Sequence, residues 1–551
     1  MRAGALAIVA ALTIGAAPAA QRTGAPAVFE RFAYSGRSLE QIRPARGEYR
    51  NPILAGYYPD PSIVRVGDDY YLINSSFAHF PGIPVFHSRD LVNWTQIGNA
   101  IDRPDQLDLS GRSVSEGVFA PDISYHDGSF YIVNTCVRCG GNYVITARDP
   151  AGPWSRPTWL DFDGIDPSLY WEGDKAYLVN NGPPNETSRY DGHRAIWVQE
   201  FDPHRLALVG KRVQIVNGGV DISKEPSWIE GPHLLKHDGA YYLIAAEGGT
   251  ADNHSEVVFR SDSVFGPFTP FAGNPILTQR ALNPARPHPI TSAGHAMLVQ
   301  TQKGDWWATF LATRPYGADL YNIGRETFLL PVTWRDGWPI ILAPGKPIPF
   351  SLKKPDLPAQ PAPRLPTSGD FSYTVDFDKG PLGPAWIGIR TPRTPVYAFR
   401  HGGLELRDGA ALGDKSGTPA FIGRRQQHAI ATVSTTLRYV PSGDGRRAGL
   451  AAIQNDGSYL ILCVTRIAGK PMAALYARTG AGIETLLASA PLSAREAELR
   501  IEANGGTMSF RYGRPHDVKQ LGEPIDATFL STKKAGGFVG TVVGPYEGPA
   551  P

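Results

Sequence analysis

A short hairpin pattern recurs along the N-terminal part of the chain. It is clearest in residues 57–73, YYPDPSIVRVGDDYYLI, where an acid before proline is followed by an apolar run, a Gly/Asp turn and an aromatic run. This order is typical of two short strands joined by a tight turn. Further copies begin at residues 120, 166, 230 and 295, and the last is the loosest. Hairpin repeats at blade-length spacing indicate a β-propeller, and five copies predict five blades.

The residue that opens each copy has a special position, because the first strand of every propeller blade lines the central channel. Three of the leading residues are carboxylic acids, namely Asp60, Asp166 and Glu230. The copy at 120–133 lacks an acid, and the last copy begins with His295. We therefore expect three carboxyl groups that are distant in sequence to meet at one mouth of the channel.

Composition indicates an all-β protein and excludes several function classes. The 551 residues include 60 Gly, 49 Pro and many aromatic residues, as expected for short strands and turns. A net charge of +2 gives no electrostatic reason to expect a nucleic-acid or membrane partner. Phosphate-loop, dinucleotide, His-Glu-x-x-His and Gly-x-Ser-x-Gly motifs are missing from the sequence, so the chemistries they support lack their usual signal.

The N-terminus resembles an export signal. Residues 1–20 contain Met1-Arg2, an apolar run to about Ile14 and an Ala17-Pro18-Ala19 cleavage box. The apolar run is shorter than the roughly 18–20 residues that a membrane span needs. The pattern predicts export to the periplasm or the extracellular space.

Proline content divides the rest of the chain. Eight prolines between residues 344 and 366 predict a semi-rigid linker. We expect an irregular leader over 21–48, the propeller over 49–345, the linker over 346–369 and a β-sandwich over 370–551. On physical grounds alone, the sandwich could be a carbohydrate-binding module or a stabilising cap.

The chain has three cysteines, Cys136, Cys139 and Cys463. The first two are separated by two residues, but a zinc site would need a second pair or suitably spaced histidines. A local disulfide and two unreacted thiols both fit the sequence.

Three carboxyl groups at an aromatic-rich channel mouth suit glycoside hydrolysis. One acid protonates the leaving oxygen, and a carboxylate activates water on the other face of the sugar. A third carboxylate raises the pKa of the acid by like-charge repulsion. An Asp before Pro is usually only a turn residue, but equivalent placement in separate repeats favours a shared function.

Ordered motifs in both halves carry a family resemblance. The chain resembles the β-xylosidases and α-L-arabinofuranosidases of glycoside hydrolase family 43, in which a concanavalin-like β-sandwich follows the propeller in the xylosidase branch. The matching motifs are Asp60-Pro-Ser, Phe119-Ala-Pro, Asp166-Pro-Ser, Glu230-Gly-Pro-His, Glu247-Gly-Gly-Thr, Ala312-Thr-Arg-Pro, Gly324-Arg-Glu-Thr, Gly423-Arg-Arg-Gln-Gln-His and Phe538-Val-Gly.

The resemblance implies roles for matched residues. Asp60 would be the general base, Glu230 the general acid and Asp166 the residue that tunes and orients the acid. Arg314 would contact sugar hydroxyls and the surroundings of the acid as a charged fork. Hydrolysis would invert the anomeric centre, with base and acid roughly 6.5–9.5 Å apart.

The resemblance also implies a sugar subsite. Phe77 and Phe119 would wall it, although ordinary blade packing explains each equally well, and Thr250 would donate a hydrogen bond. His295 would lie in the channel, where the family can hold a calcium ion or its waters, and a hydrogen-bonded core histidine is the alternative. No cofactor is implied as a requirement. Phe119 stands where the family usually has Trp, and an expected aromatic after Asp166 is replaced by Asn180-Asn181-Gly182, which leaves the sugar open.

These patterns predict an exo-acting, inverting glycosidase that releases β-D-xylose from xylo-oligosaccharides. The nearest alternative is an α-L-arabinofuranosidase, or a bifunctional enzyme, acting on arabinoxylan or xyloglucan side chains. A carbohydrate-binding propeller without catalysis is a further alternative. The partner we expect is a hemicellulose oligosaccharide, and a homo-oligomer is compatible with the sequence.

Overall fold

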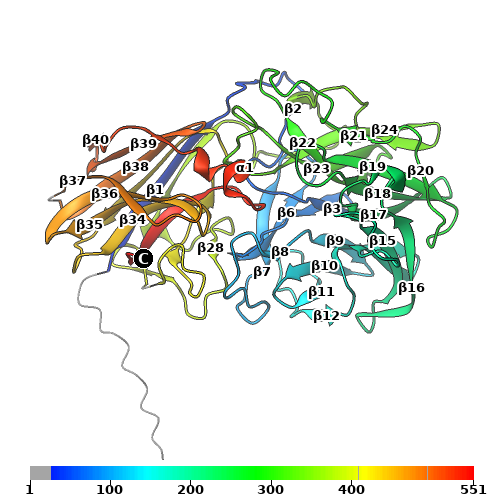
Figure 1. The fold of residues 1–551 in the computed structure, drawn as a ribbon, viewed down its shortest axis with the longest axis horizontal. Coiled ribbons are helices and arrows are strands. Elements are labelled where there is room, and N and C mark those ends of the chain that lie inside the picture. Colours follow the sequence, from blue (N-terminus) through cyan, green and yellow to red (C-terminus); the bar gives the residue numbers. More distant parts are fainter. Residues whose placement is uncertain (1–25, 408, 493) are drawn as a thin grey trace, which may run out of the picture.

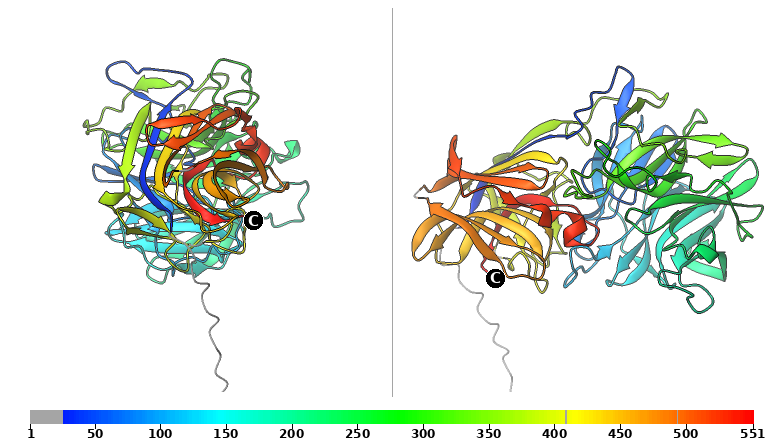
Figure 2. Two further views of the ribbon diagram at one scale, coloured as in Figure 1. Left: turned by 90° about the vertical axis from the view of Figure 1, so that its left-hand side faces the viewer. Right: turned by 45° about the horizontal axis from the view of Figure 1, so that its top comes forward.

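Two β-rich lobes lie side by side in the computed structural model, which describes residues 26–407, 409–492 and 494–551 (Figure 1). The propeller is on the right and the sandwich on the left, and Figure 2 shows the same two lobes from other sides. The export signal predicted at 1–20 lies outside the described residues. Within those residues, no helix is long and apolar enough to cross a membrane.

The propeller consists of five sheets, each with at least four strands. Its inner strands β3, β9, β13, β17 and β22 contact one another in turn, and β22 contacts β3 to close the ring. The five-bladed prediction is therefore confirmed. In chain order the blades contain β3 (Ser62–Val66), β4 (Asp69–Ile73), β6 (Gly82–Ser88) and β7 (Thr95–Ile101); β8 (Gly117–Val118), β9 (Asp122–His126), β10 (Ser129–Val137), β11 (Gly141–Ala147) and β12 (Thr158–Leu160); β13 (Ile165–Glu172), β14 (Lys175–Gly182), β15 (Ala195–Asp202) and β16 (Ala207–Asn217); β17 (Glu230–His237), β18 (Ala240–Glu247), β19 (Ser255–Ser261), β20 (Thr269–Pro270) and β21 (Leu277–Thr278); and β22 (Thr291–Gln300), β23 (Trp306–Thr313), β24 (Glu326–Arg335) and β25 (Trp338–Ile340).

Each repeat forms the first hairpin of a blade. The turn of every one of these hairpins contains a glycine with positive φ: Gly67 (62°), Gly128 (73°), Gly173 (57°), Gly239 (81°) and Gly304 (92°). Glycine adopts this left-handed backbone without the steric cost that a Cβ atom would bring. The recurring glycine thus helps to set where each inner strand ends and where the second strand of the hairpin begins.

The second lobe is a sandwich of two antiparallel sheets. The first contains β29 (Tyr397–Arg400), β30 (Gly403–Leu406), β1 (Val28–Arg37), β33 (Ile430–Arg438), β38 (Glu496–Asn504), β39 (Thr507–Arg514) and β40 (Asp517–Gln520), with β27 (Phe371–Asp376) beside β1 and β41 (Ile525–Asp526) beside β39. The second contains β31 (Ala420–Phe421), β42 (Val542–Pro549), β34 (Arg446–Asn455), β35 (Ser458–Ile467), β36 (Lys470–Arg478) and β37 (Thr485–Pro491), with β32 (Arg424–Arg425) beside β42.

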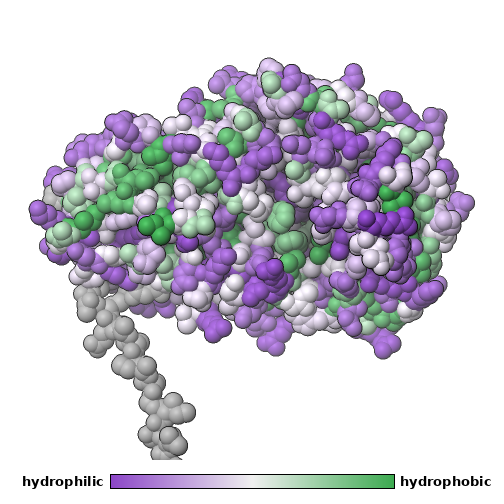
Figure 3. Space-filling view, viewed as in Figure 1, coloured by the Kyte–Doolittle hydropathy of each residue, from purple (hydrophilic) through white to green (hydrophobic). Residues whose placement is uncertain are grey.

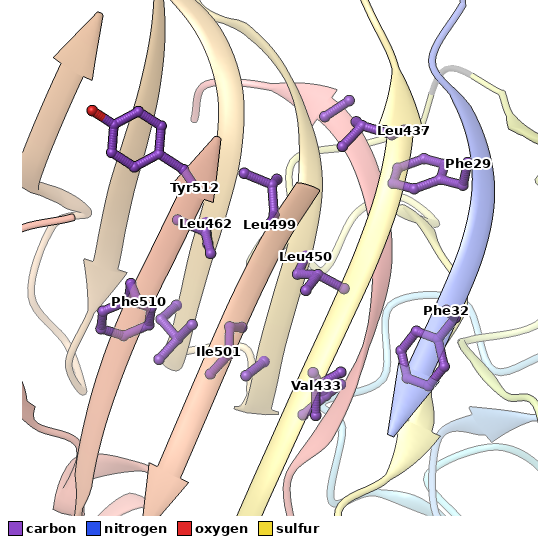
Figure 4. Close-up of a cluster of buried hydrophobic side chains, with 14 of the residues drawn as sticks. Phe29, Phe32, Val433, Leu437, Leu450, Leu462, Leu499, Ile501, Phe510 and Tyr512 are labelled. Atoms are coloured by element: carbon purple, nitrogen blue, oxygen red, sulfur yellow. The ribbon is translucent and has the colours of Figure 1, made fainter. Parts of the chain in front are cut away.

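The prediction of an irregular leader over 21–48 is wrong for residues 28–37. These residues form β1, which pairs with β27, β30 and β33 inside the sandwich. Phe29 and Phe32 are fully buried in the core between the sheets, beside Val433 and Leu437 (Figure 4). A register shift between Phe29 and Arg31 interrupts the alternation of buried and exposed residues, so the strand lacks the regular pattern by which strands are recognised.

The proline-rich segment 346–369 runs along the propeller. It contains one short strand, β26 (Ser351–Lys353), which pairs with β2 (Glu48–Arg50), although we expected no ladder there. At its end, the Thr367 hydroxyl donates to the Ile53 carbonyl and the Ser368 hydroxyl donates to the Pro52 carbonyl. The segment is therefore held against the first domain by hydrogen bonds.

Polar and stacking contacts join the two lobes. The guanidinium carbon of Arg425 in the sandwich lies 4.5 Å from the ring centres of both Tyr57 and Tyr58 in the propeller. Lys533, on the short helix α1 (Thr532–Ala535), forms a 2.8 Å ion pair with Asp319. A two-stranded sheet of β5 (His79–Phe80) and β28 (Gly388–Ile389) also crosses the junction. These contacts fix sandwich loops at the mouth of the propeller.

Two remaining features concern the cysteines and the sandwich surface. Cys136 and Cys139 form a disulfide, and Cys463 is a buried free thiol. Exposed apolar side chains, namely Ile483, Leu486 and Leu487, lie on or just before β37 at the edge of the sandwich, and Figure 3 shows a hydrophobic area over this lobe. Homo-oligomer formation stays a prediction.

Replacing Phe32 by Ala should destabilise the sandwich. The change leaves a cavity between two packed sheets, and such substitutions lower the free energy of unfolding by about 3–5 kcal/mol. Denaturant unfolding followed by circular dichroism would measure the loss. Ser35→Ala, at an exposed position of the same strand, should change the unfolding free energy by less than about 0.5 kcal/mol. Equal stability of the Phe32 variant and the wild type would show that β1 is not part of the core.

Candidate active site

A cavity of about 300 Å³ opens at one mouth of the propeller channel. It is lined by Asp60, Asp166 and Glu230, by Arg325 and His295, and by several aromatic side chains. A larger cavity of about 730 Å³ lies at the junction of linker and sandwich, but none of the three acids lines it. The smaller cavity therefore combines an apolar, aromatic lining with a few convergent ionisable groups, as binding sites for small molecules do.

The three acids reach this cavity from three blades. Asp60 precedes β3, Asp166 lies near the start of β13 and Glu230 opens β17. Their exposed fractions are 6%, 6% and 8%. The three acids, which occupy equivalent positions in separate repeats, are therefore neighbours in the folded protein.

Asp60 is held in a charged and hydrogen-bonded environment. Its Oδ2 accepts a 2.5 Å hydrogen bond from the Ser75 hydroxyl, and its Oδ1 accepts a 3.2 Å bond from Nη1 of Arg325. Burial alone would raise the pKa of this carboxyl. The charge of Arg325 and the hydrogen bond from Ser75 outweigh burial and hold the pKa of Asp60 below its usual value. Asp60 is therefore ionised at neutral pH.

Glu230 and Asp166 experience the opposite balance. Burial and the negative charge of Asp60 raise the pKa of Glu230 to about 7. Burial and the charges of Glu230 and Asp60 raise the pKa of Asp166 well above its usual value. Carboxyl groups that share a buried volume do not all ionise together. The backbone N–H of Gly231 donates to Oδ2 of Asp166 over 3.2 Å, which lowers the pKa of Asp166 but does not offset burial and the two neighbouring charges.

Several cavity residues have an unusual backbone conformation. The φ angles of Asp60, Phe77, Asp166, Trp228 and His295 are 53°, 51°, 51°, 48° and 53°. Residues with a Cβ atom rarely adopt this left-handed region, which costs about 1–3 kcal/mol per residue. Such conformations persist where the surrounding structure imposes them, and they gather at functional sites. Here they turn side chains from the blade edges into the cavity.

Three phenylalanines form one wall of the cavity. Phe77 and Phe538 stack with ring centres 5.9 Å apart and planes at 19°. Phe119 meets both rings edge-on, at 5.5 Å and 5.6 Å. Phe538 comes from the sandwich, so the second lobe completes the wall.

The structure corrects the placement of Arg314. Its Nε and Nη2 bind Glu326 at 2.6 Å and 2.8 Å, and its Nη1 binds Glu40 at 2.8 Å. All three guanidinium nitrogens of Arg314 are thus engaged in buried ion pairs, and Arg314 is not among the residues that line the cavity. Arg325, which is 5% exposed, occupies the position beside Asp60 instead.

Thr250 and His295 both line the cavity. Nδ1 of His295 lies 3.6 Å from Oδ1 of Asp60, and burial lowers the pKa of the imidazole, which is therefore neutral near pH 7. Within the part of the chain that the structure describes, no group of three or more His, Cys, Asp or Glu side chains is arranged to hold a metal ion. The surroundings of His295 do not form such a group, and calcium stays a prediction.

Sequence reasoning missed Arg325, Trp228 and Phe538 as cavity residues. Arg325 stands in the Gly324-Arg-Glu-Thr motif and Phe538 in the Phe538-Val-Gly motif. Both motifs indicated the family, but neither indicated that these side chains line the cavity. Gly324 has a φ of 77°, and a Cβ atom there would lie 2.4 Å from that of Tyr57. This close approach explains why a glycine must precede Arg325.

A five-bladed propeller that gathers one ionised and two raised-pKa carboxyl groups in a small aromatic pocket defines a glycoside hydrolase. Family models match both lobes: glycosyl hydrolases family 43 over residues 49–339, and the β-xylosidase C-terminal concanavalin A-like domain over 374–547. The chain belongs to glycoside hydrolase family 43.

Individual relatives match over nearly the whole chain. A xylosidase/arabinosidase of Butyrivibrio fibrisolvens is 39% identical, covering 90% of this chain and 95% of that protein. A non-reducing end α-L-arabinofuranosidase of Bacteroides ovatus is 35% identical, covering 93% of each. The crystal structure of a GH43_12 protein from a capybara gut metagenome has a TM-score of 0.86 at 38% identity, covering 95% of this chain and 99% of that one.

Replacing Arg314 by Met should affect stability more than substrate binding. The change leaves Glu326 and Glu40 without their shared cation, and breaking a buried pair of this kind costs about 3–5 kcal/mol. Denaturant unfolding would show the lowered stability, and the KM of the folded fraction should match that of the wild type. A stable variant with a greatly raised KM would return Arg314 to the substrate site.

Proposed function

We propose that this chain is an exo-acting, inverting β-xylosidase that removes β-D-xylose from the non-reducing ends of xylo-oligosaccharides. The observation that carries the proposal is the opposite titration of two carboxyl groups in one pocket: Asp60 is kept ionised and Glu230 is kept protonated. Inverting hydrolysis needs this combination of base and acid.

Asp60 acts as the general base. Its charge is stabilised by Arg325 and its orientation is set by the Ser75 hydroxyl. It takes a proton from a water molecule as the water oxygen forms a bond to the anomeric carbon. Attack from the face opposite the leaving group inverts that carbon.

Glu230 acts as the general acid. It donates its proton to the glycosidic oxygen while the bond between that oxygen and the anomeric carbon breaks. The carboxylate that results is favoured by the positive charges of Arg325 and Arg194, both of which lower the pKa of Glu230. The negative charge of Asp60 works in the other direction, because it raises the pKa of Glu230 and holds the proton there until the transfer. Asp166 lies in the same buried pocket and has the role of orienting Glu230.

The pocket supports action at chain ends. Its volume of about 300 Å³ is small, and the wall of Phe77, Phe119 and Phe538 closes one side. Aromatic faces offer apolar contact to the C–H groups of a terminal sugar. A pocket of this kind receives the end of an oligosaccharide more readily than its middle.

A second candidate activity is release of α-L-arabinofuranose from arabinoxylan or xyloglucan side chains, alone or beside xylosidase activity. The specific observation in its favour is the 93% mutual coverage with the α-L-arabinofuranosidase of Bacteroides ovatus. The two sugars present similar hydroxyl patterns to one pocket.

Initial rates on an aryl β-D-xyloside and an aryl α-L-arabinofuranoside, measured side by side, test the proposal. We expect higher kcat/KM on the xyloside and loss of turnover on both in the variant Asp60→Ala, which lacks the base. Circular dichroism would check that the variant is folded. A preference for the arabinofuranoside would select the second activity. A folded wild-type protein without turnover on either substrate would favour a carbohydrate-binding propeller.

The acid role of Glu230 predicts a specific pH dependence. Since Glu230 must be protonated and its pKa is about 7, kcat/KM should fall as pH rises above about 7. In Glu230→Gln, assayed on a glycoside with a strongly acidic leaving group that needs no protonation, this alkaline limb should disappear. The same limb in the variant would assign it to another residue.

We also propose export to the periplasm or the extracellular space. The N-terminal pattern and the disulfide between Cys136 and Cys139 support the proposal, because disulfides persist in oxidising compartments. Hemicellulose fragments would be available to the enzyme there.

A further inference from the structure

We propose that Trp228, backed by Arg194, is the platform that binds the second sugar of the substrate, the one that leaves with the glycosidic oxygen. The inference rests on the proposed function and extends it. It implies that the enzyme favours sugar leaving groups through a residue outside the carboxylate trio.

Trp228 has the position that such a platform needs. It lines the same cavity as the three acids, and its exposed fraction of 38% exceeds that of every other residue in the lining. It therefore lies at the rim, while the acids lie in the depth. It also precedes Glu230 by two residues, and a general acid must face the oxygen of the leaving group. The rim on this side is where the second sugar emerges.

The backbone holds Trp228 in a defined orientation. Its φ is 48°, in the left-handed region, and its N–H donates to the Gly192 carbonyl over 2.9 Å. A Cβ atom on Gly192 would lie 3.2 Å from Cδ1 of the indole, so the glycine allows this loop to approach the ring closely. The neighbouring Ser227 carbonyl accepts a 2.8 Å bond from the Gly248 N–H. The surrounding structure therefore imposes this costly conformation on an exposed Trp, as happens at functional sites.

Arg194 supports the ring by a cation–π contact. Its guanidinium carbon lies 4.8 Å from the centre of the Trp228 ring. Its Nε and Nη2 both donate to Oδ1 of Asn181, at 3.1 Å and 2.9 Å. Asn181 in turn donates from Nδ2 to the Ile229 carbonyl over 2.5 Å, between Trp228 and the acid. The same network thus positions the ring and the strand that carries Glu230.

The chemistry of this pair matches a pyranose. The indole offers a flat apolar face to the C–H groups of a sugar, and this contact does not depend on one hydroxyl pattern. Arg194 supports the indole ring with a positive charge, and a positive charge does not repel the ionised Asp60. The expected ligand of the rim is therefore a neutral sugar unit of an oligosaccharide.

Two substrates separate the platform from the inner pocket. β-D-Xylopyranosyl fluoride occupies only the inner pocket, because its leaving group is a fluoride ion, whereas the leaving group of xylobiose is a second sugar that also occupies the rim. In Trp228→Ala, the ratio of kcat/KM for xylobiose to kcat/KM for the fluoride should fall about ten-fold, and Trp228→Phe should restore most of it. Trp159→Ala, which removes a tryptophan that is 48% exposed outside the cavity lining, is the matched control and should leave the ratio at its wild-type value. An unchanged ratio in Trp228→Ala, or equal losses on both substrates, would overturn the inference.

A binding measurement gives an answer that does not need turnover. In the Asp60→Ala background, calorimetric titration with xylobiose should show an affinity about ten-fold lower when Trp228 is also Ala, while the affinity for xylose should change much less. Equal weakening for both sugars would contradict the platform. Failure of the proposed function would be seen in a different result, namely a wild-type protein that hydrolyses neither xylobiose nor the fluoride.

Discussion

The ion pair between Arg325 and Asp60 is the interaction on which the chemistry of the pocket depends. Three carboxyl groups in a buried volume would all tend to stay protonated, because burial disfavours charge. Arg325 stabilises one negative charge, that of Asp60, and the charge of Asp60 then contributes to the raised pKa of Glu230. The direct ion pair with Arg325 thus helps to separate the roles of base and acid among carboxyl groups that the fold places in equivalent positions.

The fold supplies Arg325 through the close contact of both lobes. Gly324 brings the backbone against Tyr57 and Gly540, and the guanidinium carbon of Arg325 lies 5.5 Å from the Phe538 ring of the sandwich. The sandwich in turn needs β1, from the segment that precedes the propeller. The first and last strands of the described residues therefore lie in one lobe with the propeller between them in sequence, and the active site is completed only when both lobes are folded.

Sequence reasoning succeeded where physical rules act locally and failed where they act at a distance. The five hairpins could be predicted, because alternation, turn glycines and repeat spacing are properties of short segments. Arg314 and Arg325 both stand in motifs that match the family, and no local rule tells which of them points into the cavity. The difference arises because Glu326 and Glu40 bind Arg314, and Glu40 is far away in sequence. The strand β1 was missed for a related reason, since its partners lie more than 300 residues away.

The sequence by itself determined the repeat, the number of blades and the three acids that lead them, because an equivalent position in every blade follows from periodicity alone. Tertiary structure decided the ionisation of these acids, the choice of Arg325, the wall that Phe538 completes and the exposed Trp228 at the rim. These properties depend on burial, on distances between charges and on contacts between segments that are remote in the chain. Such quantities exist only once the chain has folded.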